Sequence, residues 1–130
     1  MQTFDMIVLG SGPAGQRAAI QGAKSGKRVA VVERREVVGG ACVNTGTIPS
    51  KTMREAVMHF SGYKYQNIYG ANYRVKEKIT MADLIFRVQH VIKTEVDVSH
   101  SQLTRNGVET LWGQASFVDA NTVKVESSHQ

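Results

Sequence analysis

The sequence lacks the features typical of secreted and membrane proteins. Its 130 residues include one cysteine, Cys42, so no disulfide can form within the chain. No apolar run approaches the roughly 18 residues that a membrane-spanning helix needs. The amino terminus lacks a basic segment, and its apolar run, Met6–Leu9, is too short for a signal peptide. We therefore expect a cytoplasmic protein with no membrane partner, of one domain or part of one.

The sequence also lacks any run of five or more charges of one sign. Lys and Arg number 16 against 11 Asp and Glu, a formal net charge of +5, and most of the excess lies in the first 60 residues. Scattered pairs such as Arg34-Arg35 do not form the basic stripe typical of nucleic-acid-binding proteins. The excess is solvated surface or a positive field beside a phosphate-bearing ligand, and no nucleic-acid partner is expected.

The first third of the chain alternates between strand and helix patterns. Phe4–Leu9 and Arg28–Glu33 are short apolar runs that predict buried strands. Between them, Pro13 suits a first helical turn and Gly26 a stop, so a helix is predicted over Pro13–Ser25. Strand, helix and strand within about 30 residues form a βαβ unit, whose crossover makes the two strands parallel.

The middle of the chain has a less regular pattern. A glycine-rich segment, Val37–Gly46, precedes a predicted helix that begins at Pro49 and stops at Gly62. Residues 62–79 have no clear period, which predicts a long, partly ordered connection. All four tyrosines lie in this connection. They either pack within it or offer an aromatic surface to a partner.

The longest periodic stretch of the chain follows that connection. Thr80 with Asp83 resembles a capping box, and helical spacing of apolar residues continues to Asn106-Gly107. The remaining predicted elements are a strand at Val108–Trp112, hairpin strands at Ala115–Val118 and Thr122–Glu126, and a frayed tail at Ser127–Gln130. The third strand should join the parallel sheet outside Arg28–Glu33.

Gly10, Gly12 and Gly15 form a GxGxxG turn between the first predicted strand and helix. In a dinucleotide-binding fold, the first glycine permits the turn, the second lets the backbone approach a diphosphate, and the third allows close helix packing. Free N–H groups at the helix start also favour the diphosphate. Glu33 ends the next strand, where a carboxylate accepts hydrogen bonds from ribose hydroxyls and repels a 2′-phosphate. The pattern predicts a dinucleotide site and does not separate FAD from NAD.

The segment Gly39–Lys51, GGACVNTGTIPSK, resembles the redox loop of the flavin disulfide reductases, the relatives of lipoamide dehydrogenase and glutathione reductase. The pattern of that family is GGxCxNxGCxPSK; with the glycine turn and Glu33, the resemblance covers about the first 55 residues. Residues 113–123 also resemble the hairpin of the family. The resemblance implies an α/β fold: a three-layer, Rossmann-like FAD-binding domain, here with an incomplete parallel sheet plus a β-hairpin. The FAD-binding residues that it implies are Gly10, Gly12, Pro13, Ala14, Gly15, Glu33, Arg34, Arg35, Gly39, Gly40, Ala41, Cys42, Lys51 and Ala115.

One departure from the family pattern bears on the chemistry. The second redox cysteine of the loop falls on Thr47, so no dithiol pair can form between these positions. Disulfide reductases pass electrons through both sulfurs. This loop instead resembles the transhydrogenase branch of the family, which exchanges hydride between NADPH and NAD⁺ through FAD without a redox disulfide. No residue of the chain is assigned as catalytic with certainty; the redox-loop positions are Cys42 and Thr47, and Cys42 is alternatively a small buried hydrophobe.

Two other functions stay open from the sequence. One is another FAD-dependent NAD(P)H oxidoreductase of the same family, and the other is a redox-inert dinucleotide-binding module. Proteins of this family are several times longer and add nicotinamide-binding and dimer-interface domains. We therefore expect residues 1–130 to be the N-terminal part of an FAD-binding domain, inactive alone, within a full-length homodimer or higher homo-oligomer that binds NADP(H) and NAD(H). The four histidines have no ligand spacing, so no metal site is expected.

Overall fold

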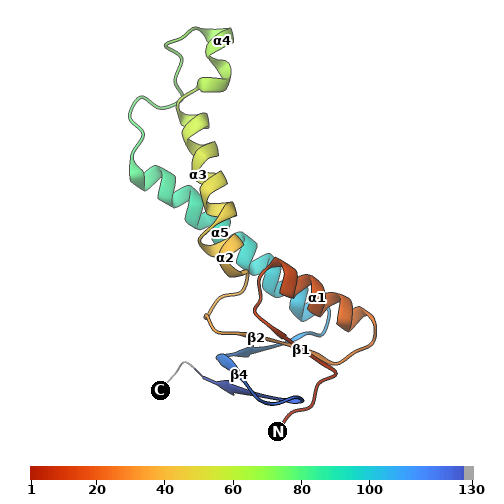
Figure 1. The fold of residues 1–130 in the computed structure, drawn as a ribbon. Helices are drawn as coiled ribbons and strands as arrows, with labels where there is room; N and C mark the ends of the chain where they lie inside the picture. The colour runs from red at the N-terminus through yellow and green to blue at the C-terminus, as the bar shows by residue number, and fades with distance from the viewer. Residues whose placement is uncertain (128–130) are drawn as a thin grey trace.

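A computed structural model describes residues 1–127, in which a parallel sheet lies between a helical layer and a β-hairpin (Figure 1). The predicted tail at Ser127–Gln130 lies outside the described residues from residue 128 onward. In chain order the elements are β1 (Met6–Leu9), α1 (Pro13–Lys24), β2 (Val29–Glu33), α2 (Gly40–Asn44), α3 (Thr47–Phe60), the 3₁₀ helix η1 (Tyr63–Tyr65), α4 (Gln66–Tyr69), α5 (Met81–Arg105), β3 (Glu109–Trp112), β4 (Gln114–Asp119) and β5 (Thr122–Glu126).

The three-stranded sheet has the predicted order, β1-β2-β3, and all its strands are parallel. In its register Ile7 pairs with Ala30, and Val31 pairs with Thr110. All five residues of the central strand β2 are buried. The predicted hairpin is confirmed as the antiparallel pair β4 and β5. Among the described residues β1 pairs with β2 alone, so the outer edge of β1 has no neighbouring strand.

The core lies between one face of the sheet and the helices α1 and α5. Alternate residues of a strand point to opposite faces. On β1, Met6 and Val8 therefore pack against the core, while Ile7 and Leu9 are 36% and 47% exposed on the other face. The fully or nearly fully buried centre consists of Ala19, Val29, Val31, Val38, Leu103 and Val108.

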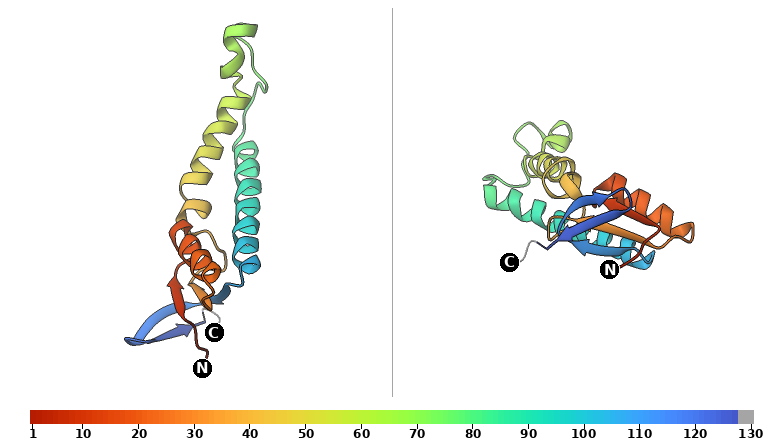
Figure 2. Two further views of the ribbon diagram at one scale, coloured as in Figure 1. Left: turned by 90° about the vertical axis from the view of Figure 1, so that its right-hand side faces the viewer. Right: turned by 60° about the horizontal axis from the view of Figure 1, so that its bottom comes forward.

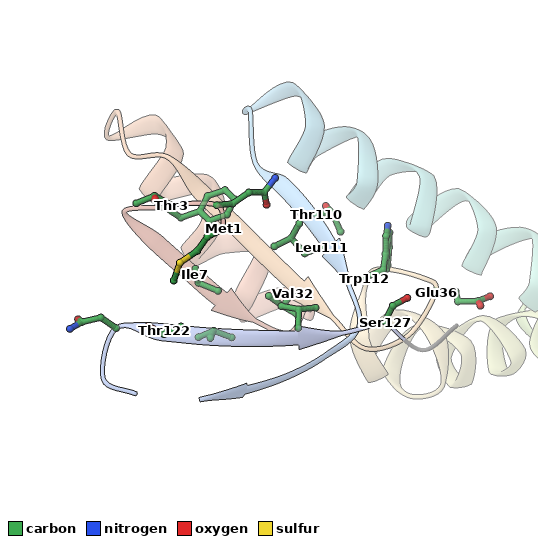
Figure 3. Close-up of a pocket in the computed structure, with 15 residues that line it drawn as sticks. Met1, Thr3, Ile7, Val32, Glu36, Thr110, Leu111, Trp112, Thr122 and Ser127 are labelled. Atoms are coloured by element: carbon green, nitrogen blue, oxygen red, sulfur yellow. The ribbon is translucent and has the colours of Figure 1, made fainter. Parts of the chain in front are cut away.

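The opposite face of the sheet borders an apolar groove of about 1130 Å³ between the sheet and the hairpin (Figure 3). Ile7 of β1, Val32 of β2 and Leu111 of β3 line it from the sheet, and Val123 and Val125 line it from β5. On this face Ile7 is partly exposed and Val32 is buried, and within residues 1–127 no strand covers the outer edge of β1.

Helices α3 and α5 pack side by side and extend away from the sheet, with α4 at the far end (Figure 2). The predicted capping box at the start of α5 is confirmed. The Thr80 hydroxyl accepts a hydrogen bond from the Asp83 N–H at 3.3 Å, and the Asp83 carboxylate accepts the Thr80 N–H at 2.9 Å. None of the helices among residues 1–127 is long and apolar enough to span a bilayer.

Several predicted boundaries were wrong for local reasons. Strand β1 begins at Met6 and not at Phe4, because the Asp5 carboxylate accepts the Arg28 N–H at 2.7 Å, a donor that a continuing ladder would use. Helix α3 begins at Thr47, before Pro49, since a proline in the first turn removes an N–H that has no helical partner there.

Two segments are more ordered than the sequence predicted. The glycine-rich segment contains the short helix α2, in which the Asn44 side-chain amide donates to the carbonyls of Val38 and Gly40. The connection after α3 contains η1 and α4. There the rings of Tyr65, Tyr69 and Tyr73 contact one another, with centroids 4.9 to 6.4 Å apart, while Tyr65 and Tyr69 are 46% and 65% exposed. These tyrosines therefore pack on one another and also form an exposed aromatic surface.

Candidate functional site

The glycine turn between β1 and α1 places open backbone donors at the carboxyl end of the sheet. Gly10 has φ +96°, a conformation that favours glycine, and its N–H donates to the Val32 carbonyl at 2.8 Å. Gly12 caps α1, and no side-chain cap or acidic residue occupies the first turn. A Cβ on Gly12 would meet no heavy atom within 4 Å, so the space beside the turn is open. A long helix with such a start favours a bound anion.

This open space belongs to a cavity of about 380 Å³. The cavity lies beyond the carboxyl ends of β1 and β2, the edge at which open α/β sheets bind ligands. Its walls come from the glycine turn, the end of β2, the start of α2 and the start of β4. The lining residues are Leu9, Gly10, Ser11, Gly12, Val32, Glu33, Arg34, Arg35, Gly40, Ala41, Gly113, Gln114 and Ala115.

Glu33 lies at the end of β2, with its carboxylate fixed by hydrogen bonds. Its Oε2 accepts the Ser11 hydroxyl at 2.5 Å and the Ser11 N–H at 2.9 Å, and its Oε1 accepts the Arg35 N–H at 3.0 Å. Burial raises the pKa of this carboxyl, but the hydrogen bonds, that of the Ser11 hydroxyl foremost, outweigh it and hold the pKa below its ordinary value of 4.5. Glu33 is therefore an ionised acceptor at neutral pH, 6% exposed, at the cavity wall.

The second glycine-rich segment approaches the first closely enough to exclude side chains. Gly39 has φ +106° and donates its N–H to the Ser11 carbonyl at 3.1 Å. Gly40 has φ +60°, and a Cβ there would lie 2.8 Å from the Cα of Gly12. Only glycine permits this approach. The glycine turn at Gly10–Gly15, the end of β2 at Glu33 and the second glycine segment at Gly39–Gly40 together form what we call the cradle.

Two exposed cations complete the wall of the cavity. Arg34 and Arg35 follow Glu33 and line the same space as Gly12. Open N–H groups and guanidinium groups suit an anionic diphosphate, and the Glu33 carboxylate suits a ribose hydroxyl. The residues present therefore fit the adenosine diphosphate half of a dinucleotide. Within residues 1–127 no cluster of three or more His, Cys, Asp or Glu side chains is placed to hold a metal ion.

Comparison with known proteins identifies the family. The family model described as pyridine nucleotide-disulphide oxidoreductase matches residues 4–130. The chain belongs to this family. The predicted fold class, an α/β fold of the Rossmann-like FAD-binding type, is thereby confirmed together with the observed sheet and hairpin.

Named relatives and a solved structure align with nearly all of the chain. A soluble pyridine nucleotide transhydrogenase of Mycobacterium bovis is 56% identical over 126 residues, and one of Yersinia pestis is 43% identical over 122. These alignments cover 97% and 94% of the chain but 27% and 26% of the relatives. The chain thus spans about a quarter of the length of these curated relatives. The Cu(II) complex of the HOCl-induced flavoprotein disulfide reductase RclA from Escherichia coli superposes with a TM-score of 0.78 at 25% identity, covering 100% of this chain and 26% of that one.

The redox-loop positions of this family lie outside the 380 Å³ cavity. Cys42 is half-buried in α2 with a free thiol, and Thr47 is exposed at the start of α3. Lys51 is exposed one turn further along α3. Since Cys42 is the only cysteine of the chain, its sulfur has no partner within the sequence.

The cavity brings together part of the predicted site. Of the predicted FAD-binding residues, those that line it are Gly10, Gly12, Glu33, Arg34, Arg35, Gly40, Ala41 and Ala115. Those that do not line it are Pro13, Ala14, Gly15, Gly39, Cys42 and Lys51. Gly15 has the close packing predicted for the third glycine, because a Cβ there would lie 2.0 Å from the Gly10 carbonyl oxygen.

Five lining residues were not singled out from the sequence. They are Leu9, Ser11, Val32, Gly113 and Gln114. For Ser11 a signal exists: it is the polar residue within the GxGxxG turn, placed where the acidic end of the next strand needs a donor. The other four contribute through the path of the backbone, which local sequence patterns do not reveal.

Proposed function

We propose that this chain is the N-terminal part of the FAD-binding domain of a flavoprotein that exchanges hydride between NADPH and NAD⁺. The observation that carries the proposal is a cavity lined by the glycine turn and Glu33, together with a loop that has a single sulfur, Cys42, and Thr47 at the position of the second. The names of the 56% and 43% identical relatives support it. Nicotinamide-binding and dimer-interface domains would belong to the remainder of the full-length protein.

The residues of the cradle would hold the adenosine diphosphate half of FAD. The N–H groups at the start of α1, beside Gly12, would bind the diphosphate. Arg34 and Arg35 would add positive charge next to it. Glu33 would accept hydrogen bonds from the adenosine ribose. Ala115 of β4, which also lines the cavity, would border the adenine.

FAD, when bound, supplies the hydride chemistry, accepting a hydride from one nicotinamide and returning it to another. Lys51 on α3 would place a cation toward the flavin ring, which stabilises the negative charge that reduction brings there. Thr47 has no thiol, so the chain offers no dithiol that would carry electrons onward to a disulfide substrate. The residues of the chain would therefore bind, orient and shield the cofactor.

For the full-length protein we further propose a cytoplasmic homodimer or higher homo-oligomer whose partners are the nicotinamide nucleotides. The name of the relatives, soluble pyridine nucleotide transhydrogenase, supports the nicotinamide nucleotides as partners and a soluble protein. The scattered charges of both signs favour neither a nucleic-acid partner nor an anionic membrane surface.

The test is a steady-state assay of the full-length protein with NADPH as donor and thio-NAD⁺, lipoamide or glutathione disulfide as acceptor. We expect turnover with thio-NAD⁺ and none with either disulfide. Arsenite, which inhibits enzymes by bridging two thiols, should leave the rate unchanged. Strong disulfide turnover or arsenite inhibition would contradict the role given to Thr47. Quinone reduction without transfer to thio-NAD⁺ would indicate another NAD(P)H oxidoreductase, and no redox activity would indicate an inert module.

A further inference from the structure

Ser11 is a buried polar residue at the junction of three segments of the cradle. Its side chain and backbone are 0% exposed. Its hydroxyl donates to Glu33 Oε2 at 2.5 Å, and its carbonyl accepts the Gly39 N–H at 3.1 Å and the Gln16 side-chain amide at 2.8 Å. The glycine turn, the end of β2 and the second glycine segment therefore meet at this one residue.

We propose that Ser11 is a positioning residue of the cofactor cradle, which holds the Glu33 carboxylate and Gly39 in the arrangement that receives the adenosine diphosphate of FAD. The inference rests on the proposed function, because it concerns the same cofactor site. Ser11 would act through Glu33, and its own hydroxyl is not required to touch the cofactor.

The Ser11 hydroxyl accepts one hydrogen bond and donates another. The Gly39 N–H lies 3.3 Å from the Ser11 Oγ, and the hydroxyl hydrogen is directed to Glu33 Oε2. A hydroxyl that accepts from one group and donates to a carboxylate orders both, and such charge-assisted bonds are the stronger ones in proteins. In contrast, a Glu33 side chain held only by backbone N–H groups would have more freedom to turn from the ribose.

A second observation separates this role from simple packing. The hydrophobic core, which includes Ala19 and Leu103, lies between the sheet and the helices. Ser11 instead lines the cavity together with Gly12 and Glu33. Removing its hydroxyl should therefore change the cradle more than the core.

The experiment uses the full-length protein with the variants Ser11→Ala, Glu33→Gln and the double variant, each stripped of flavin and titrated with FAD. We expect Ser11→Ala to weaken FAD affinity roughly tenfold, as for the loss of a hydrogen bond to a charged group. In the Glu33→Gln background the same change should cost less than about threefold, because contacting residues that act as a unit are not additive. The control is Ser99→Ala, a buried serine of α5 outside the cavity, which should retain the affinity of the unsubstituted protein.

A readout specific for the ribose distinguishes positioning from a general loss of structure. The preference for FAD over its 2′-deoxyadenosine analogue should fall in Ser11→Ala. The variant should also unfold at a lower urea concentration, because the buried Glu33 carboxylate loses a donor, but a loss of stability alone would leave the ribose preference unchanged. An affinity within twofold of the unsubstituted protein, or an equal loss in both backgrounds, would overturn the inference. Ser11→Gly serves as a second variant, and failure of both variants to fold would make Ser11 a folding residue and overturn the positioning role. If the unsubstituted protein binds FAD and Ser11→Ala binds it with the same affinity, only this inference is overturned. If the unsubstituted protein does not bind FAD, the proposed function is overturned as well.

Discussion

Two glycines of the same turn should respond in opposite ways to substitution by alanine. Gly12 has φ −67° and ψ 175°, which any residue adopts, and a Cβ there would meet no heavy atom within 4 Å. Gly12→Ala should therefore leave the flavin-free full-length protein as stable as before, or stabilise it by about 0.5 kcal/mol through the unfolded state. Its methyl group, however, would occupy the space of the diphosphate. The loss of one or more charge-assisted hydrogen bonds should weaken FAD affinity roughly 10- to 100-fold.

Gly15→Ala should damage the fold itself. A Cβ at Gly15 would lie 2.0 Å from the Gly10 carbonyl oxygen and 3.3 Å from Val8 Cγ1, so α1 or the turn must move. Overpacking of this kind costs about 1–3 kcal/mol or more. Urea unfolding of the flavin-free proteins and FAD titration, compared across the two variants, measure both effects. Full FAD affinity in Gly12→Ala would contradict the placement of the diphosphate beside Gly12. A loss of stability equal to that of Gly15→Ala would contradict the open space at Gly12.

Three further predictions concern acid stability, a helix cap and the chain by itself. Because the pKa of Glu33 in the folded protein lies below its ordinary value of 4.5, its contribution to stability should be complete above that pH and decline as the pH falls through the folded pKa. Acid unfolding should thus depend less on pH in Glu33→Gln, and an unchanged dependence would contradict the hydrogen-bonded carboxylate. Thr80→Ala should destabilise the full-length protein by about 1 kcal/mol in urea unfolding through loss of the α5 cap, with exposed Thr94→Ala as the control; equal effects would contradict the capping role. Residues 1–130 alone should bind FAD far more weakly than the full-length protein and self-associate, because the β1 edge and the apolar groove are open. Light scattering that shows a strict monomer, with submicromolar FAD affinity by titration, would refute this expectation.

The parts of the fold that the sequence predicted correctly rest on local signals. The βαβ unit follows from two apolar runs separated by a helix between Pro13 and Gly26, and the structure has it with small changes at the ends. The capping box at Thr80 is likewise a signal carried by four consecutive residues. The position of β3 outside β2 required a fold rule in addition, since nothing within Val108–Trp112 specifies its neighbour.

The parts that were missed depend on contacts between distant residues. The five-residue helix α2 is too short for a periodic signal, and a hydrogen bond from Asn44 to the Val38 carbonyl holds it against the preceding segment. The bond between Ser11 and Glu33 joins residues 22 positions apart. The apolar groove arises because the hairpin lies on the face of the sheet opposite the helices (Figure 3), a placement that the hairpin sequence does not encode locally. Glu33 itself was predicted as an acceptor, but the donors that fix its carboxylate were not.

The cofactor held by the full-length protein tests the central claim most directly. We expect the purified protein to have visible flavin absorbance, and denaturation should release FAD in an amount stoichiometric with the chain. The cradle of Gly12, Glu33 and Gly40 predicts this result because its donors and acceptor match a diphosphate and a ribose. A colourless protein that cannot be reconstituted with FAD and binds only NAD would contradict the account.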